Sequence, residues 1–157
     1  KDKKVLLIGP RNEAEIFTFL GNGFGRKTLF SIDLFSYSPL INIMDMHNLK
    51  FADNEFDIVY AGWVISYSEN RTKAISEMLR VTRPGGVVGI TATLSPVSNE
   101  DLIAKRGYMV GSKNRLQNLT DLSDLFLPFV ENGNVILLAP TSEDENAGLA
   151  CFRKSLK

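Results

Sequence analysis

Short apolar runs that end at turn residues alternate along this chain with apolar positions at helical spacing. Residues 5–8 form a continuous apolar run ended by a Gly-Pro pair, a pattern typical of a strand buried on both faces. After that turn the apolar positions recur every three or four residues. This spacing predicts a helix that begins after Asn12 as N-cap and ends at Gly21 or Gly23.

Three further short runs predict strands in the first half of the chain. They cover residues 28–33, 41–45 and 56–61, and the first two end on the carboxylates Asp33 and Asp45. Strands of this kind, separated by a helix and by turns, indicate an α/β sheet with helices on its faces. We find no repeat and no linker, so we expect a single domain over residues 1–157.

The second half continues the same alternation. An amphipathic pattern predicts a helix over residues 69–83, with residues 66–69 as a capping box before it. A Pro-Gly-Gly segment ends this helix, and residues 87–93 then form a strand. Residues 94–113 are expected to form a long functional loop. The remaining segments predict a helix over 116–126, closed by Pro128, and a hairpin of strands 135–139 and 149–152.

Composition narrows the classes of function. The 157 residues carry 18 basic and 18 acidic side chains, and this balance disfavours general nucleic-acid binding and attachment to acidic membranes by charge. Cys151 is the only cysteine and His47 the only histidine, so neither an intrachain disulfide nor a multi-histidine metal site can form. No apolar run reaches the roughly 20 residues of a membrane helix. We therefore expect a cytoplasmic protein without a metal site.

The two strand-end carboxylates suggest a ligand site. In an α/β sheet the ligand crevice lies beyond the carboxyl ends of the strands, where the turn 9–13, Asp33, Asp45 and the pair 62–63 fall. Two such carboxylates suit an adenosine-containing ligand, one for the ribose hydroxyls and one near the adenine. The alternative is that both only cap turns, which is the commoner role of a single aspartate there.

The first turn argues against a pyrophosphate ligand. A dinucleotide motif needs three glycines, and only Gly9 is present, because Arg11 and Glu13 occupy the later positions. Glu13 and Glu15 in the first helical turn suit the helix dipole but oppose a phosphate. A nucleotide-dependent oxidoreductase is thus the weakest hypothesis. Arg11 could instead clamp a ligand carboxylate, pair with Glu13 on the surface, or fill the pocket.

Two longer segments match a known family pattern. Residues 45–59 resemble the D-x-x-x-L-P-F-x-D-x-x-F-D segment of class I S-adenosylmethionine-dependent methyltransferases, and residues 77–86 resemble their E-x-x-R-V-L-K-P-G-G segment. The resemblance extends from about residue 5 to residue 93. It implies a Rossmann-like class I methyltransferase fold, with a mostly parallel, seven-stranded or slightly reduced sheet, an antiparallel last strand and helices on both faces.

The resemblance also implies the side of the site that would hold the methionine part of S-adenosylmethionine. Gly9 would be the first glycine of the cofactor loop, which continues through Pro10 and Arg11. Gly62 and Trp63, just after the fourth strand, would line the methionine and the methyl-donor side.

The adenosine side follows in the same way. The resemblance implies that Asp33 accepts the ribose hydroxyls and that Leu34 lies against the adenine. Asp45 would face the adenine amino group, and Met46 would offer a backbone contact.

The chain departs from the family pattern in three places. Leu7 stands where the family has an acidic residue. Only 11 residues separate Asp33 from Asp45, which leaves no room for a helix between their strands. The chain also begins at the first strand, without the N-terminal cap helices, so we expect a lid from residues 94–113, from a larger parent protein or from a second copy in a homo-oligomer.

No catalytic residue is assigned. His47 has a suitable pKa for a general base, although a turn histidine without a catalytic role is the commoner case. Three tyrosines, Tyr37, Tyr60 and Tyr67, could orient a substrate hydroxyl, although Tyr60 equally fits a core or rim position. The long loop has a basic character that is compatible with a small acidic substrate or with a solvated face, and the residues that give it are Arg106, Tyr108, Lys113 and Arg115.

Two functional hypotheses remain. The first is S-adenosylmethionine-dependent methyl transfer to a small molecule. The second is a catalytically inactive scaffold or interaction domain of the same fold, which the degenerate glycine loop favours. Replacing Arg11 by glycine should weaken cofactor binding under the first hypothesis and restore it under the second.

Overall fold

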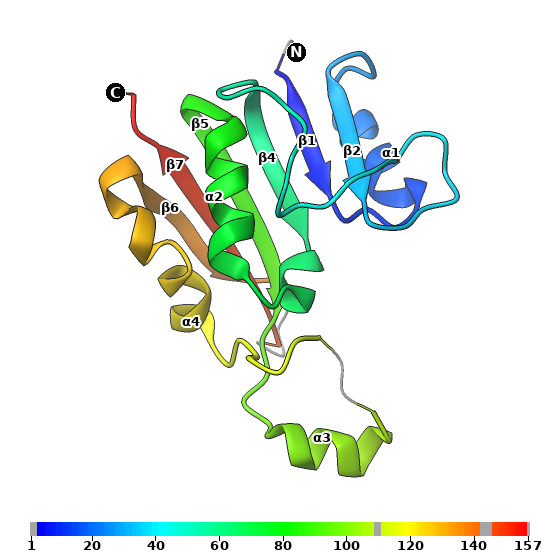
Figure 1. The fold of residues 1–157 in the computed structure, drawn as a ribbon, viewed down its shortest axis with the longest axis vertical. Helices are drawn as coiled ribbons and strands as arrows, with labels where there is room; N and C mark the ends of the chain where they lie inside the picture. Colours follow the sequence, from blue (N-terminus) through cyan, green and yellow to red (C-terminus); the bar gives the residue numbers. More distant parts are fainter. Residues whose placement is uncertain (1–2, 109–110, 142–145, 157) are drawn as a thin grey trace.

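A seven-stranded sheet forms the centre of the molecule (Figure 1). The computed structural model describes residues 3–108, 111–141 and 146–156. The order across the sheet is β3-β2-β1-β4-β5-β7-β6. Neighbouring strands from β3 to β5 are parallel, and β7 is antiparallel to both β5 and β6, as predicted. The strands are β1 (Val5–Ile8), β2 (Leu29–Asp33), β3 (Asn42–Ile43), β4 (Phe56–Gly62), β5 (Thr82–Thr93), β6 (Gly133–Pro140) and β7 (Ala147–Lys154).

Helices cover both faces of the sheet, and one lies beyond its edge. In Figure 1, α2 and α4 lie in front of the sheet and α1 lies behind β1 and β2, while α3 extends below the carboxyl ends of β4 and β5. None of the described helices is long and apolar enough to cross a membrane. The α-helices are α1 (Glu13–Gly21), α2 (Arg71–Val81), α3 (Asn99–Arg106) and α4 (Leu119–Asp124), and two 3-10 helices are η1 (Val64–Tyr67) and η2 (Leu127–Asn132).

The buried strand β1 divides the core into two clusters. Leu6 and Ile8 pack on the α2 side, whereas Val5 and Leu7 pack with Ile16 of α1 on the other side. All four strand residues are at most 2% exposed. Their alternation to opposite faces follows from strand geometry, and burial on both faces explains why this run is continuously apolar. Leu7 is therefore a core residue.

Hydrogen bonds from an ion pair on α2 join the two segments that resemble the family pattern. Glu77 of α2 accepts hydrogen bonds from Arg80 Nε and Nη2, each at 2.9 Å, and from the backbone N–H of Leu49 at 2.9 Å. Arg80 also donates to the carbonyls of Leu49 and Phe51 and, at 2.6 Å, to Asp53. These contacts fix residues 49–53 against α2, so the two segments have a structural role.

The helix α2 begins later than predicted. Its N-cap is Asn70, whose side chain accepts a bond from the N–H of Lys73 at 3.0 Å, so the predicted capping box over residues 66–69 is wrong. Those residues belong instead to η1 and to the turn after it. The predicted apolar face of the helix is correct, since Ala74, Ile75 and the other positions at that spacing are buried.

Three further segments differ from the prediction in extent. Strand β5 already begins at Thr82, which pairs with Phe56 before a bulge carries the chain through the Pro-Gly-Gly segment. The predicted loop over 94–113 contains the helix α3. Helix α4 is only six residues long, because a 3-10 helix with Pro128 in its first turn follows at once. As expected, no helix lies between β2 and β3, where all residues are described.

Candidate functional site

The register of the central strands brings the predicted site residues to one edge of the sheet. Ile8 of β1 is level with the residues that precede Asp33 in β2 and Gly62 in β4. Gly9, Asp33 and Gly62 therefore follow one another across the carboxyl ends of three parallel strands. Asp45 comes two residues after β3, on the outer side of β2. We call this edge the crest.

Asp33 lies at the crest with most of its hydrogen-bonding capacity free. Its Oδ1 accepts one long bond, at 3.4 Å, from the backbone N–H of Phe35. The loop that follows is apolar and exposed: Leu34 is 65% exposed, and Phe35 contacts Tyr37 edge to face with ring centroids 4.8 Å apart. A carboxylate beside exposed apolar side chains can accept hydroxyl donors while a flat ring packs next to it.

Asp45 is held by the following turn. Its Oδ1 accepts the backbone N–H of His47 at 2.8 Å and lies 2.6 Å from the ring Nδ1 of the same residue. That backbone bond, above all, holds the pKa of Asp45 below its usual value. The carboxylate side chain is still 49% exposed, so its second oxygen can accept a donor from a ligand.

The other nitrogen of the His47 ring contacts a buried serine. His47 Nε2 lies 2.8 Å from Ser68 Oγ, which also accepts the backbone N–H of Asn70 at 3.2 Å. The order Asp45, His47, Ser68 is that of a hydrolase triad, but Ser68 is only 3% exposed and its hydroxyl is engaged at the start of α2. The serine cannot reach a substrate, and the chain of bonds positions Asp45.

Met46 contributes to the core. Its side chain is 6% exposed and packs in the cluster on the α2 side. Only its backbone is left to contact a ligand, which is the kind of contact that the family resemblance implies.

Side chains from other elements lie so close to the two glycines of the crest that neither position has room for a Cβ. Gly9 has φ +87, and a Cβ there would lie 2.5 Å from Cβ of Val64. A Cβ at Gly62 would lie 2.4 Å from Oε1 of Glu15. Burial raises the pKa of Glu15, which reaches the crest from α1. The sequence could not show this contact, because it depends on how α1 packs on β4.

The side chain of Arg11 does not occupy the predicted ligand pocket at the crest. The side chain is exposed, while its neighbour Pro10 is buried. The Ser38 side chain, above all, lowers the pKa of the Glu13 carboxyl. The geometry thus favours neither the predicted surface pair with Glu13 nor a guanidinium inside the pocket, and it leaves Arg11 free to meet a ligand.

Trp63 has an unusual backbone conformation directly after β4. Its φ of 63 lies in the left-handed region, which costs a non-glycine residue on the order of 1 kcal/mol. The backbone N–H is held by Thr91, with the carbonyl at 3.0 Å and Oγ1 at 3.1 Å. Tyr60 donates to or accepts from the same hydroxyl at 3.1 Å. The indole of Trp63 remains 45% exposed.

A cavity of about 500 Å³ lies next to Trp63, beyond the carboxyl ends of β4 and β5. We call it the cationic pocket, because the charged residues that line it within the described part of the chain are all basic. They come from the start of α2, the end of α3 and the segment after it, and are Arg71, Lys105, Arg106 and Arg115. Tyr67 also lines this pocket, whereas Tyr108 and Lys113 are exposed.

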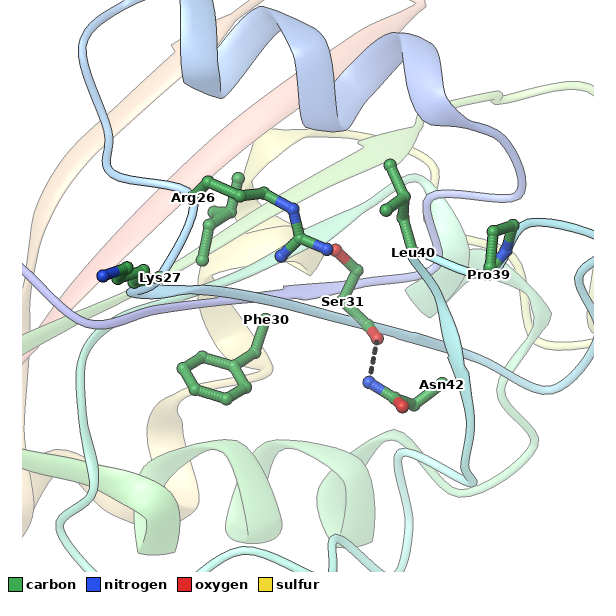
Figure 2. Close-up of a pocket in the computed structure, with 8 residues that line it drawn as sticks. Arg26, Lys27, Phe30, Ser31, Pro39, Leu40 and Asn42 are labelled. Atoms are coloured by element: carbon green, nitrogen blue, oxygen red, sulfur yellow. Dashed lines mark hydrogen bonds between the residues drawn. The ribbon is translucent and has the colours of Figure 1, made fainter.

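A second recess, of about 300 Å³, lies at the outer edge of β2 (Figure 2). Arg26 and Lys27 border it just before the strand, and Asn42 Nδ2 donates to the carbonyl of Ser31 across it at 3.4 Å. It opens towards the amino end of β2, away from the crest. None of the predicted site residues lines it.

The side chains at the crest fit S-adenosylmethionine by their chemistry. That molecule offers hydroxyl and amino donors on its adenosine, two positive groups on its methionine part and one carboxylate. The crest offers the carboxylates of Asp33 and Asp45, the half-buried carboxyl of Glu15 and the free guanidinium of Arg11. Among the described residues no group of three or more His, Cys, Asp or Glu side chains could hold a metal ion.

Comparisons with known proteins agree with this fold. A family model described as a methyltransferase domain matches residues 27–90. A malonyl-[acyl-carrier protein] O-methyltransferase from Halorhodospira halophila is 31% identical over 93 residues, which cover 58% of this chain and 30% of that protein. A demethylmenaquinone methyltransferase from Desulfitobacterium hafniense is 46% identical over 44 residues, or 28% of this chain and 17% of that one. The chain spans less than a third of the length of the curated relatives it matches.

Solved structures extend the similarity to the whole chain. A SAM-dependent methyltransferase from Methanosarcina mazei has a TM-score of 0.72 at 15% identity, covering 99% of this chain and 94% of that one. A SAM-dependent methyltransferase from Aquifex aeolicus has a TM-score of 0.71 at 12% identity, covering 98% and 83%. Residues 27–90 thus match a methyltransferase domain, and the whole chain has the fold of solved SAM-dependent methyltransferases.

Proposed function

We propose that the chain binds S-adenosylmethionine at the crest and takes part in methyl transfer to a small molecule. The observation that carries this proposal is the pair of available carboxylates, Asp33 and Asp45, at the carboxyl ends of adjacent parallel strands. The balanced charge of the chain supports a small molecule over a nucleic acid as the methyl acceptor. We also propose that the protein acts in the cytoplasm.

On the adenosine side each residue has one task. Asp33 accepts the ribose hydroxyls with its free oxygen, and Leu34 offers exposed apolar surface to the adenine. Asp45 accepts the adenine amino group with the oxygen that His47 does not occupy, and the backbone of Met46 completes the contact. His47 is thus a positioning residue.

On the methionine side the contacts come from the loop after β1 and from the end of β4. Gly9 and Pro10 form the loop after β1, and Arg11 binds the carboxylate of the cofactor. Gly62 and Trp63 line the side of the site where the methyl group of the cofactor lies. When bound, the cofactor supplies a methyl group on a positive sulfonium, which is electrophilic without activation by an acid. The protein's contribution is therefore alignment of donor and acceptor and exclusion of water.

Calorimetry with S-adenosylmethionine and S-adenosylhomocysteine tests the proposal. We expect a dissociation constant in the micromolar range for the chain, and Asp33→Asn or Asp45→Asn should weaken binding about tenfold or more, because each removes a charged hydrogen-bond acceptor. Asp124→Asn is the matched control, since Asp124 is exposed at the end of α4. Absence of heat at hundreds of micromolar ligand would defeat the proposal.

A second candidate function is an interaction domain that does not bind the cofactor. It is favoured by the contacts of Val64 and Glu15 with the two crest glycines, because these side chains already occupy space beside the loop. Arg11→Gly distinguishes the candidates: it weakens S-adenosylhomocysteine binding if Arg11 holds the ligand carboxylate. If binding is absent in the unchanged chain and appears in the variant, the interaction domain is the better description.

A further inference from the structure

The cationic pocket beside Trp63 indicates the chemistry of the acceptor. We propose that the methyl acceptor carries an anionic group, a carboxylate or a phosphate, that binds in this pocket between the start of α2 and the end of α3. The assignment of the ligand as a methyl acceptor rests on the proposed function, whereas the affinity of the pocket for anions does not.

The charge of the pocket is one-sided in a chain that is neutral overall. Among the described residues its lining includes four basic side chains and no acidic one, although the chain carries as many acidic as basic residues. A concave site lined by charges of one sign concentrates its field and attracts ligands of the opposite sign. Lys105 and Arg106 lie in the last turn of α3, where the helix dipole itself favours cations. Their presence in the lining is therefore weaker evidence for a bound anion.

Arg71 carries the argument furthest. Its Nε donates to the carbonyl of Ile65 at 3.2 Å, and Nη2 donates to Ser112 Oγ at 2.7 Å and to the carbonyl of Asn114. These bonds hold the guanidinium in one place, and burial lowers its pKa. Within residues 3–108, 111–141 and 146–156 no carboxylate lies within ion-pair distance of it. Glu69 is near enough only to oppose the fall in pKa.

A partly desolvated cation that has no carboxylate partner among the described residues is costly, and a bound anion would reduce that cost. The position of Arg71 in α2 adds to this cost. Arg71 and Lys73 stand in the first turn of α2, which has no acidic residue, so their charges oppose the positive end of the helix dipole. An anion at this place interacts favourably with the guanidinium and with the helix terminus together.

Four more observations fit a small ligand with a polar group. Ser66 lines the pocket, and its buried Oγ has no hydrogen-bond partner among the described residues. Arg115 also lines the pocket, and its Nη1 donates to the carbonyl of Val97 at 3.2 Å. The exposed rings of Trp63 and Tyr67 provide apolar surface for the rest of the molecule. A cavity of about 500 Å³ accommodates a small molecule.

Trp63 is the only tryptophan, so its fluorescence reports occupancy of the pocket directly. We would titrate the chain with phenyl phosphate, phenylacetate and the neutral phenylacetamide, exciting at the red edge of the indole band, and repeat the titrations by calorimetry. We expect both anions to bind at least tenfold more tightly than the amide. A preference for phenyl phosphate identifies phosphate as the anionic group, and equal or tighter binding of phenylacetate identifies a carboxylate.

Variants locate the binding. Arg115→Gln should weaken anion binding about tenfold, because a charged hydrogen bond is lost, and Arg71→Gln should weaken it at least as much. Arg115→Gln keeps the test valid if the more deeply anchored Arg71 is needed for folding. Lys113→Gln is the matched control, since Lys113 belongs to the same segment, carries the same charge and does not line the pocket.

Three results would overturn the inference: equal binding of the amide and the anions, no binding of either anion at millimolar concentration, or equal weakening by Lys113→Gln and Arg115→Gln. Calorimetry with S-adenosylhomocysteine separates this failure from failure of the proposed function. Binding of S-adenosylhomocysteine without anion preference leaves the proposed function intact. Anion binding without affinity for S-adenosylhomocysteine leaves an anion site in a chain that does not bind the cofactor.

Discussion

Replacing Arg80 by alanine should be among the most destabilising single changes on the surface of α2. The guanidinium makes five hydrogen bonds, two to Glu77, one to Asp53 and one each to the carbonyls of Leu49 and Phe51. Its removal leaves the Glu77 carboxylate, which is 10% exposed, with only the longer contact at 3.8 Å to the ammonium of the exposed Lys73 as an ion pair. Breaking a buried pair costs about 3–5 kcal/mol, and the 31% exposure of Arg80 places the expected loss near the lower value.

Urea unfolding followed by circular dichroism measures this loss. A change of about 3 kcal/mol also lowers the Tm by about 6–12 °C for a domain of this size. Glu77→Gln in the Arg80→Ala background removes the poorly compensated charge while an amide oxygen can still accept the N–H of Leu49. We expect the double variant to be more stable than Arg80→Ala alone. A loss below 1 kcal/mol for Arg80→Ala, or a double variant that is less stable still, would refute the argument.

The same pair has a pH dependence with a definite sign. Hydrogen bonds from Arg80, above all, hold the pKa of Glu77 below its usual value. A carboxyl with a lowered folded-state pKa contributes stability above its unfolded-state pKa of about 4.5, and this contribution is lost as the pH falls through the folded-state value. The difference in stability between the unchanged chain and the double variant should therefore be constant above pH 6 and shrink below about pH 4.5. A difference that grows on acidification contradicts the assignment.

Two further predictions concern the crest. Gly9→Ala should cost about 3 kcal/mol in urea unfolding, because it combines a left-handed φ with a collision at Val64; Gly23→Ala, with nearly the same φ but open space around it, should cost only about 1 kcal/mol, and equal losses would remove the collision from the account. His47→Ala should weaken S-adenosylhomocysteine binding about fivefold in calorimetry by loosening Asp45, and an undiminished effect in the Asp45→Asn background would show that His47 acts elsewhere.

The central part of the fold could be predicted from the sequence because local patterns decide it. Strand β1 is apolar throughout and buried on both faces, and Asn12 caps α1 with a bond to the N–H of Ala14 at 3.0 Å, as the spacing indicates. Helix α3 was not predicted, because Leu102 is its only buried residue and Ile103 is 47% exposed, which leaves almost no amphipathic pattern. The start of α2 was misplaced for another reason: two sets of polar residues can cap a helix there, and in the structure the earlier set belongs to η1 and the turn after it, while Asn70 caps the helix.

Some residues of the candidate site could be predicted from the sequence, and others could not. Asp33 and Asp45 could be found from the sequence, since a polar residue at the end of an apolar run marks the carboxyl end of a strand. Glu15, Ser68 and Arg71 could not, because their roles depend on contacts between elements far apart in the chain: α1 on β4, the turn after β3 on η1, and α2 on the segment after α3. No local pattern distinguishes these three residues from ordinary surface polar residues.

The segment from Trp63 to Tyr67 links the two proposals physically. Val64 packs against Gly9 at the crest, whereas Trp63, Ser66 and Tyr67 line the cationic pocket. One short piece of backbone, held to β5 through the N–H of Trp63, thus forms a wall of both places. Because methyl transfer depends on alignment of donor and acceptor, a shift of this segment should impair transfer more than it impairs binding of either partner alone. The left-handed conformation of Trp63 is consistent with this demand, since strain of this kind persists where the surrounding structure fixes a residue for function.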